Sequence, residues 1–326
     1  MFNKTTQNFV LSTLSYETLQ LSLTQPAHPS VFGNIKKGNI YVVGSCNGLV
    51  CLYARSLDEF EVVIWNPATR ETKVVPKSNL PRLLPAGYKT IIDSIEFGFD
   101  AKTNDYKIIN LLTPYDMLAN SFTERIIQSE VYSLSADSWR KGDSPLCCSG
   151  ELYTVGLNTY INGMASWAAS NRSWDGILSF DMSDEVFLKT PLPDDVLDNC
   201  NLSKNGLGNC KRSFFLFKES IAMAVTTLVD YCICFDIWRL LEVGVKDSWT
   251  KLFTIGPFSE YIDRPLGFWK SSTMFLTKFN QLFLYNPFTN QMVDLQIRGG
   301  LRRLVTYKES LVSVQRGNEF EEQDDC

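Results

Sequence analysis

A short turn recurs along this chain at intervals that constrain the fold more than any other feature. Residues 65–69 read Trp-Asn-Pro-Ala-Thr and residues 285–289 read Tyr-Asn-Pro-Phe-Thr, each between strand-like segments. Looser copies of the same strand–turn–strand unit lie between them, at residues 131–139, 179–187 and 235–249. A unit that recurs every ~45–65 residues indicates a closed repeat architecture rather than a protein built around one cleft.

Local physics explains the residues that the two turns share. Pro67 and Pro287 fix φ at the second position of a β-turn. The side chains of Asn66 and Asn286 can hydrogen-bond the turn backbone from the first position. The aromatic residue before each asparagine, Trp65 in the first copy, belongs to a strand and can pack between sheets. Two unrelated hairpins are the alternative interpretation of the pair.

Strand-like segments group into five units, at residues 40–76, 91–142, 152–193, 213–256 and 265–297. In the first unit, Asn47-Gly48 favours the positive φ values of a tight hairpin turn. A half-unit remains at each end of the chain, and neither half can bury its own faces; these are residues 8–23 and 301–315. Joined together, they would form a further sheet and remove exposed strand edges.

We therefore predict an all-β fold, a kelch-like β-propeller of six blades whose last blade is closed by the N- and C-terminal strands. Five or seven blades are the alternatives. The predicted domain boundaries are a propeller domain at residues 1–318 and an acidic, disordered tail at residues 319–326.

Composition limits the classes of partner. Of 326 residues, 44% are hydrophobic and 13% are aromatic, which suits a large packed β core. The formal net charge of −5 argues against nucleic acid as a partner, because phosphate binding needs a cationic surface. No apolar run is long enough to span a membrane, and the N-terminus lacks the pattern of a secretory signal. We expect a cytoplasmic protein, with the nucleus as a second location.

The residues that catalysis usually needs are scarce. His28 is the only histidine and lies between Pro26 and Pro29 in an expected loop, so we expect no Ser-His-Asp or Cys-His arrangement. The nine cysteines include no Cys-x-x-Cys pair, which favours buried free thiols over a zinc site. We predict no catalytic residue, no cofactor and no metal. The remote alternative is a propeller glycoside hydrolase, whose acids would come from Asp93, Glu96, Asp175 and Asp181.

Motifs follow one another in the order found in a known family. They lie at residues 44–51, 65–71, 97–108, 130–140, 177–182, 242–251 and 265–270. The first reads Gly-Ser-Cys-Asn-Gly-Leu-Val-Cys, and the third contains Gly-Phe-Asp followed by Asn-Asp-Tyr-Lys-Ile. In this order they resemble the F-box-associated domain of plant F-box proteins, a group that includes the S-locus F-box proteins and their relatives.

The resemblance implies a substrate-recognition subunit of an SCF-type ubiquitin ligase, acting as a non-catalytic adaptor. In such proteins an N-terminal F-box docks the Skp adaptor and thereby the cullin, while the propeller binds the target to be ubiquitinated. The S-locus group adds a secreted ribonuclease of pollen recognition as one target class. Residues 1–40 show no F-box pattern. A stand-alone protein-binding propeller without ligase docking is therefore the alternative.

Two groups of residues are assigned roles. Protein-recognition surfaces favour Tyr, Trp and Arg, and the candidate partner-binding residues are Arg82, Tyr88, Tyr115, Arg172 and Trp174. Each has an alternative role as an ordinary loop or core residue. The residues predicted to build the blades are Asn47, Gly48, Trp65, Asn66, Pro67, Trp139, Trp249, Trp269, Asn286 and Pro287.

Overall fold

A computed structural model of the chain describes residues 39–55, 60–81, 84, 86–119, 121–122, 128–143, 153–170, 174–197, 211–270, 272–298 and 304–315. The chain divides into two compact units. Unit 1 contains Met1–Asn79, Leu134–Ser138 and Val305–Cys326, and unit 2 contains Leu80–Ser133 and Trp139–Leu304.

Unit 1 holds one antiparallel sheet. Its strands follow chain order and are β1 (Asn39–Cys46), β2 (Leu49–Arg55), β3 (Phe60–Trp65) and β4 (Thr72–Val74). Trp65 is buried in the core of this sheet, beside Val50, Leu52, Ala54 and Val63. The apolar residues of β2 and β3 therefore bury one shared face.

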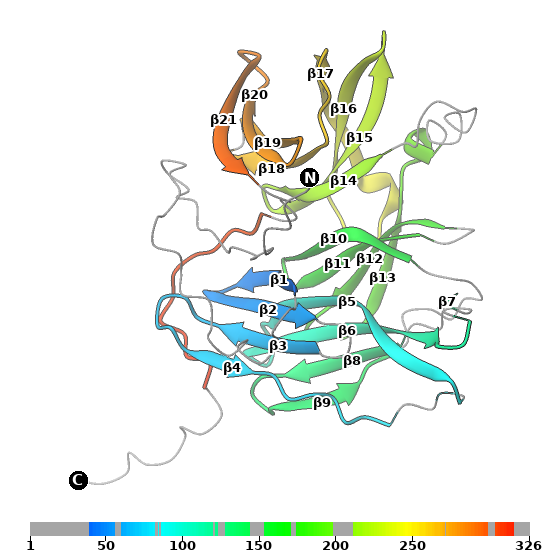
Figure 1. Ribbon diagram of the computed structural model, residues 1–326, viewed down its shortest axis with the longest axis vertical. Helices are drawn as coiled ribbons and strands as arrows, with labels where there is room; N and C mark the ends of the chain where they lie inside the picture. Colours follow the sequence, from blue (N-terminus) through cyan, green and yellow to red (C-terminus); the bar gives the residue numbers. More distant parts are fainter. Residues whose placement is uncertain are drawn as a thin grey trace, which may run out of the picture. The chain divides into compact units, whose positions relative to one another are not determined.

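Unit 2 holds four further antiparallel sheets that also follow chain order (Figure 1). The first comprises β5 (Tyr88–Asp100), β6 (Asp105–Asp116), β8 (Gln128–Ser133) and β9 (Ser138–Lys141), with β7 (Ser121–Phe122) pairing on β6. The next comprises β10 (Tyr153–Ile161), β11 (Met164–Ser170), β12 (Asp175–Asp181) and β13 (Phe187–Pro191). The last two comprise β14 (Arg212–Phe217), β15 (Ser220–Val229), β16 (Cys232–Leu240) and β17 (Trp249–Phe258), then β18 (Arg264–Trp269), β19 (Thr273–Lys278), β20 (Gln281–Asn286) and β21 (Gln291–Arg298).

The recurring turn has the same place in all five sheets. Each of its copies connects the third strand to the fourth, and these connections are residues 66–71, 134–137, 182–186, 241–248 and 287–290. A short 3-10 helix, η3 (Lys246–Ser248), lies in the fourth of them. The predicted all-β repeat is confirmed, and its five units coincide with the five sheets.

Sheets in the middle of unit 2 bury both of their faces. Trp167 of β11 packs with Ile109 of the preceding sheet, whereas its neighbour Ala168 packs with Met223 of the following sheet. Successive side chains of a strand point to opposite faces. Strands covered on both sides are buried along their length. β6 is buried without interruption from residue 105 to residue 113, although Asp105, Lys107, Asn110 and Thr113 are polar.

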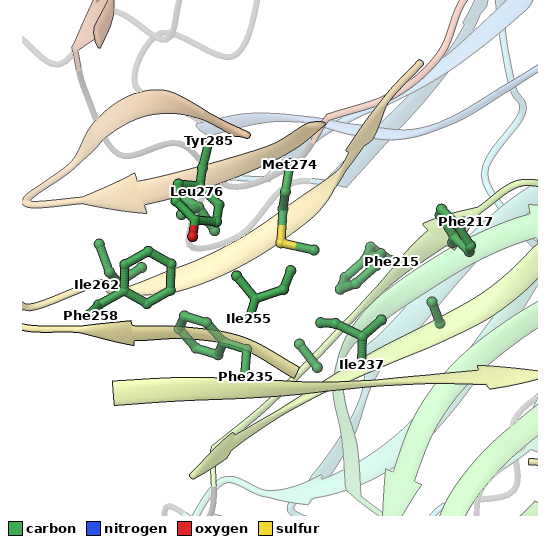
Figure 2. Packing of buried hydrophobic residues seen from close by; sticks show 12 residues of the cluster. Phe215, Phe217, Phe235, Ile237, Ile255, Phe258, Ile262, Met274, Leu276 and Tyr285 are labelled. Carbon is green, nitrogen blue, oxygen red and sulfur yellow. The ribbon is translucent and has the colours of Figure 1, made fainter. Parts of the chain in front are cut away.

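The last two sheets meet through a mainly apolar cluster, which Figure 2 shows. Phe215 of β14 and Phe235 of β16 lie in one cluster with Met274 and Leu276 of β19. Burial of one such side chain stabilises the fold by about 1.5–3 kcal/mol. Hydrophobic contact therefore holds these neighbouring sheets together.

The first strands of successive sheets in unit 2 contact one another: β5 contacts β10, β10 contacts β14, and β14 contacts β18. This succession is the blade arrangement of a β-propeller. The turns after these strands also meet. Tyr160 Oη donates to the carbonyl oxygen of Phe99 (2.8 Å), and Asn162 Nδ2 donates to that of Glu219 (3.2 Å). The first-to-second-strand turns of these blades therefore share one end of unit 2.

The prediction of a sixth blade built from both chain ends was wrong. The described residues form five sheets, and residues 304–315 contain no strand; residues 8–23 and the predicted tail 319–326 lie outside the described part of the chain. Backbone groups of the C-terminal segment bond instead to side chains of the first sheet. The N–H of Val314, for example, donates to Glu71 Oε2 (3.1 Å). The kelch-like character of the blades stays a prediction.

Asn66 holds this C-terminal segment, residues 304–315, which we call the latch. Nδ2 of its fully buried side chain donates to the carbonyl oxygens of Ser310 (2.9 Å) and Val312 (2.7 Å). Its Oδ1 accepts from the backbone N–H groups of Ala68 (2.9 Å) and Thr69 (3.4 Å). One side chain therefore both shapes the predicted turn and fixes the latch.

Gly48 leaves room for the latch. Its φ is +85°, and a Cβ at this position would lie 2.1 Å from Cβ of Ser310. The preceding residue, Asn47, has a φ of 46°, so the pair adopts the positive values of a tight hairpin turn. Tyr307 of the latch packs against the core of the first sheet. Close backbone approach and apolar contact thus reinforce the bonds from Asn66.

Asn66→Ala and Asn286→Ala separate the turn from the latch. Oδ1 of Asn286 accepts from the N–H groups of Phe288 (2.9 Å) and Thr289 (3.4 Å), as in the first copy of the turn. We expect Asn286→Ala to lower the free energy of unfolding by about 1 kcal/mol. Asn66→Ala should lower it by about 2–4 kcal/mol, because this change also leaves two carbonyl groups of the latch without a hydrogen-bond donor. Hydrogen exchange of residues 304–315 should accelerate only in Asn66→Ala. Equal acceleration in both variants, or in neither, would contradict the latch.

Candidate functional site

The two ends of the sheets in unit 2 carry different features. One end carries the first-to-second-strand turns, and we call it the clasp face; the described residues of its turns are 101–104, 162–163, 218–219, 270 and 272. Because neighbouring strands are antiparallel, the second-to-third-strand connections lie at the other end. We call this end the loop face, and its described residues are 117–119, 174, 230–231 and 279–280.

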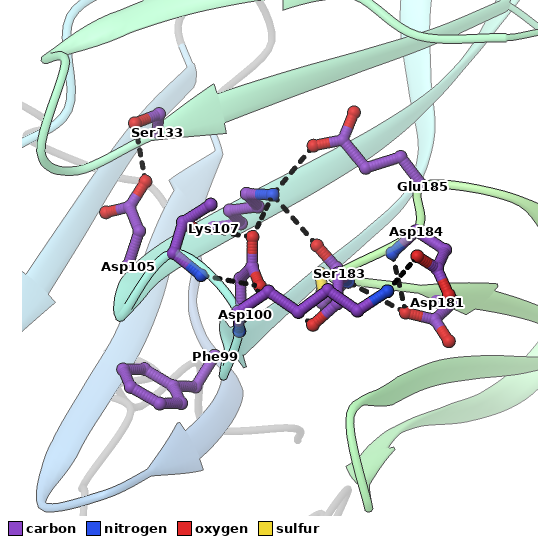
Figure 3. Close-up of polar contacts among 12 residues, drawn as sticks. Phe99, Asp100, Asp105, Lys107, Ser133, Asp181, Ser183, Asp184 and Glu185 are labelled. Carbon is purple, nitrogen blue, oxygen red and sulfur yellow. Dashed lines mark hydrogen bonds and ion pairs between the residues drawn. The ribbon is translucent and has the colours of Figure 1, made fainter.

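A buried lysine joins two sheets at the clasp face (Figure 3). Lys107 of β6 donates from Nζ to Asp100 Oδ2 (2.6 Å), and across the junction to Glu185 Oε1 (2.7 Å) and the carbonyl oxygen of Met182 (2.9 Å). An ammonium group has three donors, so each is used. The side chains of Lys107 and Asp100 are 8% and 0% exposed. A buried charge is tolerated only when it is paired and hydrogen-bonded in this way.

Asp100 is the acceptor at the centre of this cluster. Its Oδ1 accepts from the N–H of Lys102 (2.8 Å) and from Ser183 Oγ (2.7 Å), and its Oδ2 accepts from Thr103 Oγ1 (2.6 Å). Burial alone would raise the pKa of Asp100, but the bonds from Lys107, Thr103 and Ser183 outweigh it and hold the pKa well below its usual range. The carboxylate therefore stays ionised and keeps its partners in place.

The turn at residues 182–186 is preformed for this contact. Asp181 Oδ1 accepts from the N–H groups of Ser183 (2.8 Å) and Asp184 (2.9 Å). An exposed ion pair between Lys102 and Asp184 lies beside the buried cluster. Because solvent-exposed pairs contribute little to stability, the buried lysine and its acceptors dominate the junction.

On the loop face, two of the predicted binding residues lie side by side. At the far end of the β5–β6 hairpin, Tyr88 pairs with Asp116, and Lys89 pairs with Tyr115. Lys89 Nζ lies 5.5 Å from the centroid of the Tyr115 ring. The pKa of Asp116 is lowered, mainly because its carboxylate accepts a hydrogen bond from the N–H of Ala119. Burial has a smaller, opposite effect, and the Tyr88 hydroxyl also lowers the pKa. Both tyrosines are half-buried at this ledge.

Of the remaining predicted binding residues, the structure describes Trp174 alone. Trp174 lies at the loop face but packs partly against the core around Trp167. Lys189 Nζ lies 6.0 Å from the centroid of its ring. This packing is that of a core residue, which was the alternative for Trp174. Arg82 and Arg172 lie outside the described residues.

The tryptophans predicted to build the blades differ in burial. Trp65 and Trp249 are buried, and Trp249 Nε1 donates to the carbonyl oxygen of Pro191 in the preceding sheet (3.0 Å). Trp139 and Trp269 are half-buried. The indole N–H of Trp249 thus adds a polar contact to an apolar junction.

Sequence reasoning missed the exposed aromatic turns of the loop face. The β15–β16 connection is the two-residue turn Asp230-Tyr231, and the β19–β20 connection is Phe279-Asn280. Tyr231 is 101% exposed and Phe279 is 65% exposed. Two strand-like runs separated by two residues are a hairpin signal. These turns were not recognised in the sequence, because Asn-Gly or Asp-Gly is the pair expected in a two-residue hairpin turn and an aromatic residue is not.

The positions of the acidic side chains bear on the hydrolase alternative. In the part of the chain that the structure describes, no three His, Cys, Asp or Glu side chains are placed to hold a metal ion, and no helix is long and apolar enough to cross a membrane. Of the acids considered for a hydrolase, Asp175 pairs with Arg212 (2.5 Å) and Asp181 shapes a turn. Glu96 is buried within β5. Asp175 and Asp181 are therefore engaged by the fold.

Comparison with known proteins identifies the family. Residues 1–291 match the model of a family described as the F-box associated beta propeller domain. The chain belongs to this family. The F-box/kelch-repeat protein At3g23880 of Arabidopsis thaliana is 29% identical over 254 residues, covering 75% of this chain and 60% of that protein. The F-box protein CPR1 of the same plant is 27% identical over 261 residues, covering 72% of this chain and 55% of that protein.

The chain thus spans less than two thirds of the length of these two relatives. Among solved structures, the NanB sialidase of Streptococcus pneumoniae gives a TM-score of 0.40 at 9% identity, over 80% of this chain and 61% of that one. A likeness at this level carries no argument about function.

The geometry explains why this F-box-associated propeller carries its sequence motifs. Asp100 and Lys107 come from the motif at residues 97–108, and Asp181 and Met182 come from the motif at residues 177–182. These residues fasten two blades at the clasp face. These two motifs therefore serve the scaffold, and the loop face is the candidate site for binding a partner.

Asp100→Asn tests the buried cluster. The change keeps the shape of the side chain but removes the charge that faces Lys107, so we expect a loss of about 3 kcal/mol in the free energy of unfolding at neutral pH. A lowered carboxyl pKa stabilises the fold above a pH of about 4, and this contribution fades as the pH falls through the folded value. Urea unfolding between neutral pH and about pH 3 should therefore show a shallower acid loss in Asp100→Asn than in the unchanged protein.

Asp184→Asn is the matched control, because Asp184 lies in the same cluster but its ion pair with Lys102 is exposed. Its unfolding curve should coincide with that of the unchanged protein at every pH. Two equally stable variants would show that the buried pair does not hold the blades together.

Proposed function

We propose that this chain is the target-recognition part of an SCF-type ubiquitin ligase and is itself a non-catalytic adaptor. Membership of the F-box-associated propeller family carries the proposal, and the relatives named as F-box proteins support it. In this proposal the blades form a rigid scaffold, and connections at the loop face contact the target. A Skp adaptor and a cullin would join through an F-box, in the cytoplasm or the nucleus.

The loop face suits a protein partner better than a small molecule. Its half-buried Tyr88 and Tyr115 form a ledge, and exposed apolar residues lie next to them at Met117 and Leu118. Aromatic residues flanked by apolar and polar neighbours are typical of protein-recognition surfaces. The S-locus resemblance makes a secreted ribonuclease one target class to test.

An F-box joined to the chain provides the test. We would express in plant cells the chain alone, the chain with the F-box of a relative at its N-terminus, and that F-box alone. The joined protein should bind the Skp adaptor and lower the abundance of a small set of proteins. A proteasome inhibitor should restore those proteins, because ubiquitination by the other subunits marks them for degradation. The chain alone should capture the same proteins without lowering their abundance.

Different outcomes separate the alternatives. Capture of a protein by the chain, with no change in its abundance when the F-box is joined, would favour a stand-alone binding propeller. Absence of any captured protein would contradict recognition itself. Turnover of an aryl glycoside that Asp93→Asn abolishes would contradict the non-catalytic role.

A further inference from the structure

We propose that Tyr231, Tyr261 and Phe279 form an aromatic patch that binds a lysine- or arginine-bearing segment of a partner protein. The inference rests on the proposed function, since it gives the chemistry by which the loop face would recognise a target. The three rings are 101%, 47% and 65% exposed. They lie on or beside the second-to-third-strand turns of the last two blades.

Backbone conformation points to a role outside folding for two of the rings, those of Tyr231 and Phe279. Asp230 and Tyr231 have φ values of 48° and 64°, and Phe279 and Asn280 have values of 49° and 58°. Residues with bulky side chains rarely adopt this region, because Cβ approaches the carbonyl oxygen too closely. Tyr231 is fully exposed, so packing does not compensate this strain. Backbone strain of this kind is found at functional sites.

One chain segment lies beside both turns. Ile233, close behind the first turn, pairs with Phe258 at the end of β17. The chain continues from Phe258 to Tyr261, whose ring centroid lies 5.7 Å from that of Phe279. The segment between β17 and β18 therefore connects the exposed tyrosine of one blade with the exposed phenylalanine of the next.

Charge around the patch selects a cationic partner. Asp230 precedes Tyr231, and Glu260 and Asp263 flank Tyr261 in the sequence. Among the described residues, Glu260 pairs with Lys278, whereas Asp230 and Asp263 have no cationic partner. An ammonium or guanidinium group binds the face of an aromatic ring, and an adjacent carboxylate strengthens the attraction. The net charge of −5 also favours the approach of a basic segment.

Glycine substitution tests the patch without unfolding the protein. The probe is a short fluorescent peptide in which lysine alternates with serine, and the same peptide with glutamate in place of lysine controls for charge. Fluorescence anisotropy with the full chain at low salt should detect binding of the lysine peptide only. The double variant Tyr231→Gly/Phe279→Gly should bind about tenfold more weakly, because two ring contacts are lost. Its melting temperature should stay the same or rise, since glycine adopts positive φ without strain.

Phe288→Ala is the matched control. Phe288 is 84% exposed in the third-to-fourth-strand turn of the blade that contains Phe279. The Phe288→Ala substitution therefore removes a similar exposed ring that lies outside the patch. We expect wild-type peptide binding in this variant. Equal binding by the double variant and the unchanged chain, or equal weakening in Phe288→Ala, would overturn the proposal, as would preference for the glutamate peptide. A target captured equally well with and without the double substitution would overturn the patch but leave the proposed function standing.

Discussion

Burial of the Lys107 ammonium group fixes how two neighbouring blades meet. A charge in this position needs an acceptor for each of its donors, and those acceptors come from β5 and from the turn at residues 182–186. The junction can form only when the β5–β6 turn and the β12–β13 connection lie together. Apolar packing supplies most of the stability of the blades, but it is not directional. The hydrogen bonds of Lys107 are directional, so they fix the relative orientation of the two blades.

In unit 1, a second buried polar side chain also joins segments that are distant in the sequence. The buried amide of Asn66 bonds to its own turn and to the latch, so local turn geometry and the position of a segment distant in the sequence depend on one residue. Asn286 occupies the corresponding position in the last blade and makes the local bonds of the turn. The same short sequence thus forms only a turn in the last blade, whereas in the first it forms the turn and also binds the latch.

Most of the blade structure could be predicted from the sequence, because its signals are local. Alternating strands and the turn around Asn66 and Asn286 depend on neighbours in the chain, and they placed the five sheets correctly. The structure of the C-terminal segment could not be predicted in this way. Its apolar residues are typical of strands, but its backbone groups bond to the side chains of Asn66 and Glu71, which are distant in the sequence. Tyr231 and Phe279 escaped notice for the opposite reason, since their turns break the usual residue preferences.

The residues that build the scaffold are distinct from those proposed to recognise a partner. The most direct test is a mutational scan of the whole chain, joined to an F-box, that records protein abundance and target capture separately for each variant. Substitutions at Asp100, Lys107 and Asn66 should lower abundance, and capture should fall only in proportion. Substitutions at residues 117–119, 230–231 and 279–280 should lower capture while abundance is kept. Loss of capture at full abundance from changes at Asp100 or Lys107 would contradict the account.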